Sequence, residues 1–170
     1  MGGRMTPLPA SSAELVERHR PELLRYLVRL LGDEDDAQDA CQEACLRAHR
    51  AFTRLGPDAN ARAWLYRIAT NSALDAARVR TRSRARTADT DPDTLPAGTV
   101  APAEDRAELR AIARAVRALP PRQRAALMLR RFHDLDYAEI AAALGGNAAA
   151  ARANVYQAVR RLRAALGGSR

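Results

Sequence analysis

The chain has 170 residues and a formal net charge of +8, and all 28 of its basic residues are Arg. Hydrophobic residues make up 47% of the chain but aromatic ones only 4%, so Leu, Ala, Val and Ile must fill the interior. No apolar run approaches the roughly 18 residues that span a bilayer, and the N-terminus lacks the apolar centre of a signal peptide. We therefore expect a cytoplasmic protein with no membrane insertion, in which both cysteines are free thiols.

Charge is distributed unevenly along the chain. Residues 1–105 carry 15 Arg against 16 Asp and Glu, whereas residues 106–170 carry 13 Arg against 4 acidic residues. A polyanion such as DNA is the expected partner of the second part, because Arg at phosphates releases condensed counterions. A bias of the genome towards Arg codons would explain the lack of Lys, but it would not explain this asymmetry.

The first half of the chain has the periodicity of helices. Leu residues recur at intervals of three and four over residues 12–31, which predicts an amphipathic helix with a break or a new first turn at Pro21. Gly32 is expected to end it, and the following acids suit the start of a helix over residues 35–52. Residues 53–60, TRLGPDAN, predict a loop before a third helix over residues 61–82. Strand-like alternation appears nowhere, so the predicted fold is all-α.

A segment rich in Pro, Thr, Asp and Gly, SRARTADTDPDTLPAGTVAP, separates two helical modules and predicts a flexible linker. Its acidic residues lack the following Gly and Glu of a calcium loop. We place a disordered N-terminus at residues 1–11, a first helical domain at 12–82, the linker at 83–103, a second helical domain at 104–167 and a tail at 168–170.

Residues 137–162, YAEIAAALGGNAAAARANVYQAVRRL, have the pattern of a helix-turn-helix. Ile140 and Leu144 are expected to face inward from a short first helix. Gly145 marks the turn, and Asn147 is the expected N-cap of the second helix. The inward stripe of that second helix is expected to be Ala148, Ala151, Val155, Val159, Leu162 and Leu166.

The other side of this second helix carries residue types that contact DNA. Arg binds guanine edges and Gln binds adenine edges in a bidentate way, while contacts to phosphates set position without reading sequence. A helical hairpin with a solvated basic face is the alternative, but spacing, turn glycine, cap and charge together favour DNA binding. We expect base edges to be reached by Arg152, Tyr156 and Gln157, and phosphates by Arg160, Arg161 and Arg163.

Taken together, the two modules resemble a bacterial sigma factor of the extracytoplasmic-function group, the small two-domain members of the sigma-70 family. The first module is similar to region 2 of that family in DDAQDACQEACLRAHRAF and RAWLYRIATNSALDAARVR. The second is similar to region 4 in ALPPRQRAALMLRRFHDLDYAEIAAALG. The resemblance covers residues 15–166 and includes the position of the linker.

The resemblance implies three interfaces. A surface that docks on core RNA polymerase would consist of Asp36, Asp39, Gln42 and Glu43. Opening and reading of the minus-10 promoter element would use Asp58, Asn60, Arg62, Trp64, Tyr66, Arg67, Asn71, Asp75 and Arg78, although for Trp64 we favour a place in the core. The minus-35 element would be read in the major groove by Arg152, Asn154, Tyr156, Gln157, Arg160 and Arg161.

The resemblance also implies how the protein works with its partners. Core RNA polymerase and promoter DNA are the expected partners, and an anti-sigma factor is expected to occlude the polymerase-binding surfaces. In the free protein we expect the two modules to be loosely tethered. On core polymerase they would be held apart at the spacing of two promoter elements.

Cys41, Cys45 and His49 fall at i, i+4 and i+8 of one predicted helix, which raises the possibility of a metal site, a redox pair or an inner face. They rise about 12 Å along the helix, so one metal can take two of them but not all three. The family usually holds large apolar residues at these positions, so we expect a buried stripe, with Ala44, Leu46 and Phe52 alongside it. A thiol sensor stays as the alternative, although the geometry within a helix disfavours a disulfide. No metal and no cofactor are expected.

Other function classes remain open. A helix-turn-helix transcriptional regulator would bind duplex DNA without acting as a polymerase subunit, but it would need a ligand or receiver domain that the helical first half does not suggest. A helical adaptor would hold polymerase without promoter choice. We expect no enzyme, because the sequence has no phosphate-binding Gly loop, no nucleophile elbow and no pair of His residues at ligand spacing.

Overall fold

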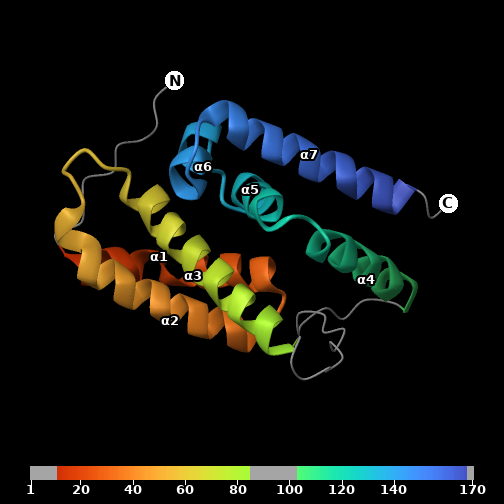
Figure 1. The fold of residues 1–170 in the computed structure, drawn as a ribbon, viewed down its shortest axis with the longest axis horizontal. Helices are drawn as coiled ribbons and strands as arrows, with labels where there is room; N and C mark the ends of the chain where they lie inside the picture. Colours follow the sequence, from red (N-terminus) through yellow and green to blue (C-terminus); the bar gives the residue numbers. More distant parts are fainter. Residues whose placement is uncertain (1–10, 85–102, 168–170) are drawn as a thin grey trace.

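The computed structural model describes residues 11–84 and 103–167, and within these ranges it is helical with no strand (Figure 1). The predicted all-α class is therefore confirmed for this part of the chain. The predicted N-terminal disorder, most of the linker and the tail lie outside the described residues. In chain order the elements are α1 (Ser12–Leu31), α2 (Glu34–Ala51), η1 (Phe52–Arg54), α3 (Ala61–Arg84), α4 (Ala103–Arg117), α5 (Pro121–Phe132), α6 (Tyr137–Leu144) and α7 (Ala148–Gly167).

Capping residues at both ends determine where helix α1 begins and ends. The side chain of Ser11 accepts a hydrogen bond from the backbone N–H of Glu14 at 3.2 Å, and Gly32 ends the helix in a left-handed conformation, φ 75°. The prediction of a break at Pro21 is wrong, because α1 runs through it without interruption. Pro21 is exposed, so the backbone carbonyl that loses its hydrogen-bond donor there can bind water instead.

The first module is a three-helix bundle of α1, α2 and α3. Helix α2 presents a stripe of alanines to its neighbours, and small side chains let the helix axes approach closely. Helix α1 supplies the large residues that fill the space between them, so the low aromatic content is offset by leucine. The buried residues of the bundle include Leu23, Tyr26, Leu27 and Leu30 from α1, Ala37, Ala40, Ala44 and Ala48 from α2, and Leu65, Tyr66, Ala69 and Ala73 from α3.

The second module consists of α4, α5, α6 and α7. Pro121 occupies the first turn of α5, where its missing N–H would have no intrahelical partner. Leu129 and Ile140 are fully buried where α5 and α6 meet, and α7 packs on both of these helices. Helix α4 lies alongside the C-terminal half of α7 and contacts it (Figure 1).

The two modules pack against one another. Helix α6 contacts α3 and α5 contacts α1, so one cluster of buried residues runs through both modules. The expectation that the modules are loosely tethered in the free protein is therefore wrong for this structure. The modules stay together because side chains of α3 and the loop before it form hydrogen bonds to the second module, and side chains of α1 contact His133 and Phe132.

None of the helices in the described part of the chain is both long and apolar enough to cross a membrane.

Candidate nucleic-acid interface

The helix-turn-helix is built from α6, a two-glycine turn and α7. Asp136 caps α6 by accepting from the backbone N–H of Glu139 at 2.8 Å, and the Glu139 carboxylate accepts from the backbone N–H of Asp136 at 2.9 Å. Gly145 and Gly146 take φ values of 74° and 134°, where side chains are strained. Asn147 then caps α7 by accepting from the backbone N–H of Ala150 at 2.8 Å, as the sequence predicted.

The inner side of α7 differs from the predicted stripe at two places. Ala151 is buried as expected, and the larger residues that follow at intervals of three or four are half-buried. Ala148, the first residue of α7, is exposed. Ala158 is fully buried and was not predicted, although it lies two turns after Ala151 on the same face.

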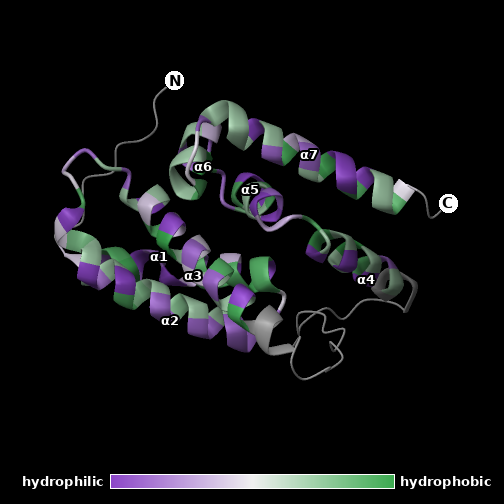
Figure 2. Cartoon of the chain, viewed as in Figure 1, coloured by the Kyte–Doolittle hydropathy of each residue, from purple (hydrophilic) through white to green (hydrophobic). Residues whose placement is uncertain are grey.

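The outer side of α7 exposes most of the side chains that were predicted to read the minus-35 element. Tyr156 has 67% of its surface exposed, which is high for a large aromatic side chain. Figure 2 shows hydrophilic residues recurring along the length of α7. Arg152, Tyr156, Gln157, Arg160 and Arg161 are exposed, and Asn154 is half-buried.

Two residues that the sequence did not single out orient this surface. The guanidinium of Arg152 lies 5.2 Å from the centre of the Tyr137 ring, a cation–π contact that draws it towards α6. Gln123 of α5 donates from its side-chain nitrogen to the side-chain oxygen of Gln157 at 3.2 Å. Because that oxygen is engaged, the amide nitrogen of Gln157 is the group left to meet a base. Only the packing of α5 beside α7 reveals this constraint.

The predicted polymerase-docking residues lie on α2. Asp39 and Gln42 are exposed, whereas Asp36 and Glu43 are half-buried. The carboxylate of Glu43 accepts from Arg47 at 2.7 Å, and Arg47 also pairs with Asp75 of α3 at 3.2 Å. Arg47 was not predicted as a site residue. It links Glu43, a predicted docking residue, to Asp75, a predicted minus-10 residue.

The predicted stripe of Cys41, Cys45 and His49 is partly wrong. Cys41 is buried and Cys45 half-buried, but His49 is exposed and lies 2.8 Å from the hydroxyl of Ser12. Leu46, expected alongside the stripe, has 43% of its surface exposed. Each step of four residues turns about 40° around a helix of 3.6 residues per turn, so the third member rotates away from the core.

The two thiols interact with each other. Their mutual hydrogen bond lowers the pKa of the Cys45 thiol to about 7 and raises that of the more buried Cys41. Among the described residues, no group of three or more His, Cys, Asp or Glu side chains could hold a metal ion.

The predicted minus-10 residues lie on α3 and the loop before it. Asn60 caps α3 by accepting from the backbone N–H of Ala63 at 2.9 Å. Trp64 is half-buried and packs against the core, as we favoured. Tyr66 is only 1% exposed, and Arg62 is half-buried. The exposed members are Asp58, Asn60, Arg67, Asn71, Asp75 and Arg78.

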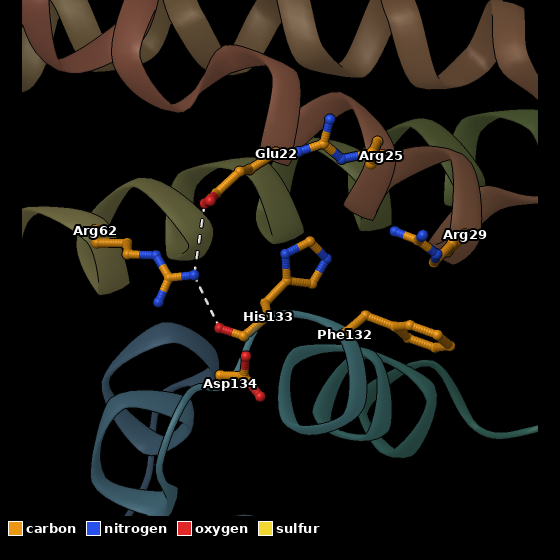
Figure 3. Close-up of a pocket in the computed structure, with 7 residues that line it drawn as sticks. All are labelled: Glu22, Arg25, Arg29, Arg62, Phe132, His133 and Asp134. Atoms are coloured by element: carbon orange, nitrogen blue, oxygen red, sulfur yellow. Dashed lines mark hydrogen bonds and ion pairs between the residues drawn. The ribbon is translucent and has the colours of Figure 1, made fainter.

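Three of these residues bond to the second module. The Tyr66 hydroxyl lies 2.8 Å from Nδ1 of His133, and Arg62 donates to the backbone oxygen of His133 at 2.8 Å (Figure 3). The side-chain nitrogen of Asn60 donates to the carboxylate of Glu139 at 3.0 Å. Arg62 also pairs with Glu22 of α1 at 3.5 Å. Neither His133 nor Glu22 was predicted, because nothing in the sequence places them beside α3.

His133 is held as a neutral imidazole. It is 5% exposed, and its ring packs edge-on against Tyr26 at 5.6 Å between ring centres. Burial lowers its pKa to about 4, with a further lowering from the positive charge of Arg29 and an opposing contribution from Glu22.

Comparisons with known proteins show which family the chain belongs to. A model described as Sigma-70 region 2 matches residues 15–83, and one described as Sigma-70, region 4 matches residues 109–162. The ECF RNA polymerase sigma factor SigL of Mycobacterium tuberculosis is 34% identical over 155 residues, covering 89% of this chain and 86% of that protein. The chain belongs to the extracytoplasmic-function group of the sigma-70 family. This sigma-70 group is not a family of enzymes.

Other members of the sigma-70 family differ in length. The ECF RNA polymerase sigma factor SigE of Mycolicibacterium smegmatis is 34% identical over 153 residues, with 88% of this chain aligned. The chain spans 59% of the length of that relative. The sigma factor RpoE of Bartonella quintana, solved with the anti-sigma factor NepR, has a TM-score of 0.74 at 21% identity, covering 93% of this chain and 98% of that one. The likeness to RpoE shows that the two share a fold.

We predict that mild acid separates the two modules. When they part, His133 becomes exposed and its pKa returns towards 6.5, so the separated state binds more protons between pH 6.5 and 4. The closed arrangement is thus fully favoured above pH 6.5 and loses about 1 kcal/mol per pH unit as the pH falls through this window. Small-angle scattering should show a larger radius of gyration at pH 5 than at pH 7.5.

His133→Asn is the matched control for this experiment, because the amide does not titrate. Its radius of gyration should be the same at the two pH values. An equal expansion of the wild type and the variant would assign the response to other groups.

Proposed function

We propose that the protein is a promoter-specificity subunit of bacterial RNA polymerase. The observation that carries this proposal is the presence of both sigma-70 regions in one chain, each on its own helical module, with a capped helix-turn-helix in the second. Such a subunit binds core polymerase and directs initiation at promoters with minus-10 and minus-35 elements. We place it in the cytoplasm, where the chromosome is transcribed.

Docking on core polymerase is assigned to α2. Its exposed carboxylate and amide groups, Asp39 and Gln42, lie on the side of the helix opposite the alanine stripe, so they can contact a partner without disturbing the bundle. The names of the relatives, RNA polymerase sigma factors, support polymerase as that partner.

Reading of the minus-10 element is assigned to α3 and the preceding loop. Arg67, Asn71 and Arg78 are exposed along one helix, which suits contacts to the phosphates and bases of a separated strand. Tyr66, Arg62 and Asn60 bond to the second module in this structure. Tyr66 is buried in this structure and becomes available to DNA only when the modules part, so its use at a promoter requires opening.

Reading of the minus-35 element is assigned to α7. Its exposed Arg and Gln side chains suit major-groove readout, and the later arginines suit phosphate contacts. An anti-sigma factor is proposed as the regulatory partner, since the solved RpoE is a complex with such a protein. It would act by holding the modules in an arrangement that promoters cannot engage.

The direct test mixes the purified full chain with bacterial core RNA polymerase and fragmented genomic DNA of the source organism, and sequences the run-off transcripts. Discrete start sites that share two upstream elements are the expected result. Binding to duplex DNA without initiation would instead favour a helix-turn-helix regulator. Circular dichroism and addition of a known sigma factor would establish that the chain is folded and the polymerase competent.

Asp39→Arg is expected to weaken core polymerase binding about tenfold or more, because it reverses an exposed charge at the proposed docking surface. Fluorescence titration of labelled protein with core polymerase measures the affinity. Glu17→Arg makes the same change of charge at an exposed position of α1 and should bind as the wild type does. Equal affinities for all three proteins would place the docking surface elsewhere.

Gln157→Ala is expected to relax the minus-35 preference at one base pair, because it removes the amide nitrogen that is left to meet a base, and a mismatched base pair in a specific site costs about 1–3 kcal/mol. The measurement is initiation across a library of randomised minus-35 elements. Arg163→Ala, a change at a proposed phosphate contact, should weaken initiation uniformly without changing the preferred sequence. An unchanged preference in the Gln157 variant would remove this residue from the readout.

A further inference from the structure

A polar cavity of about 220 Å³ lies at the boundary between the two modules, and the proposed function does not use it. It receives side chains from α1, from the start of α3 and from the connection between α5 and α6 (Figure 3). Its lining residues are Glu22, Arg25, Arg29, Arg62, Phe132, His133 and Asp134.

Positive charge in this cavity exceeds the negative charge that faces it. Three guanidinium groups and two carboxylates line the cavity; Glu22 is engaged by Arg62 at 3.5 Å, and Asp134 lies on the other side of His133 from Glu22 (Figure 3). Arg25 and Arg29 form no ion pair with any carboxylate whose side chain the structure describes. Arg29 instead lies 4.6 Å from the centre of the Phe132 ring, a contact that leaves its N–H groups available.

A second observation points to a ligand in the same place. Nε2 of His133 is buried and has no hydrogen-bond partner. The Tyr66 hydroxyl donates its one proton to the Glu22 carboxylate at 3.4 Å, so at 2.8 Å it accepts from Nδ1–H of His133, and we assign the unprotonated nitrogen of the imidazole to Nε2. Nε2 is thus a buried acceptor on the side of the ring that faces Arg29 (Figure 3). Buried polar atoms are rarely left unpaired in folded proteins.

We propose that this cavity binds a phosphate group between Arg25 and Arg29 of the first module and His133 of the second. Guanidinium groups bind phosphate oxygens in a bidentate way, and the P–OH group of a hydrogen phosphate can donate to the unpaired Nε2 of His133. The volume is below the roughly 300 Å³ of pockets that enclose a drug-sized ligand. The cavity therefore admits inorganic phosphate, diphosphate or the terminal phosphate of a nucleotide whose remainder stays in solvent.

Such a ligand favours the closed arrangement because the groups that would hold it come from both modules. A ligand that binds only one state multiplies the population of that state by one plus the ratio of its concentration to its Kd. A phosphate at ten times its Kd thus raises the closed population about elevenfold relative to the open one. This consequence rests on the proposed function, in which the modules must part before promoter binding, and it makes the anion an inhibitor of initiation.

The test is isothermal titration calorimetry of the full chain with sodium phosphate, sodium diphosphate and AMP at pH 7.5, with sodium chloride at matched ionic strength as the blank. Saturable binding is expected for at least one of the three. Tightest binding of inorganic phosphate would identify the free anion, and tighter binding of diphosphate or AMP would identify the phosphate of a larger molecule. Either result supports the site.

Arg25→Gln and Arg29→Gln should each weaken that binding at least tenfold. Arg18→Gln is the matched control, because Arg18 lies on the same helix and pairs with Glu14 outside the cavity. Binding that does not saturate, or that is equal in all variants, would overturn the proposal. The titration contains no polymerase and no promoter, so its failure is distinct from a failure to initiate transcription.

Discussion

A buried hydrogen bond between Tyr66 and His133, 2.8 Å long, joins the two modules, and the rest of their arrangement depends on it. Both side chains are nearly inaccessible to water, so the bond must replace what each loses on burial. It can do so only while the imidazole is neutral, because a buried charge beside Arg29 would be far more costly. Arg62 binds the backbone of the same residue, which ties the position of the α5–α6 connection to α3.

The same α3 surface serves two purposes that exclude each other. In the closed arrangement Arg62 and Tyr66 hold the second module, whereas in the proposed initiation complex they face promoter DNA. The closed state must therefore be stable enough to persist in the free protein and weak enough for polymerase to open it. The few hydrogen bonds that cross the boundary suit such a balance, since each contributes only modest net free energy. An anion in the interface cavity would shift the balance towards closure.

Helix α2 shows how few large residues this bundle needs. Its alanines let α1 and α3 approach closely, and leucines from α1 fill the remaining space. The side of α2 opposite the alanines carries acidic residues, and some of these form ion pairs within the protein. Glu43 is one of these, because Arg47 holds it and also reaches Asp75. Asp39 has no such engagement with the described side chains and is the better probe of docking.

The sequence by itself determined the elements, because helix periodicity and caps are local: the helix-turn-helix, the Asn147 cap and the all-α class follow from neighbouring residues. Local rules failed where a helix runs through the exposed Pro21 and where four-residue steps carry His49 off the buried face. Only the tertiary structure decided that His133 meets Tyr66, that Gln123 orients Gln157 and that three arginines surround one cavity. Those contacts join residues far apart in the chain, and their geometry is set by how whole helices pack, which no local pattern encodes.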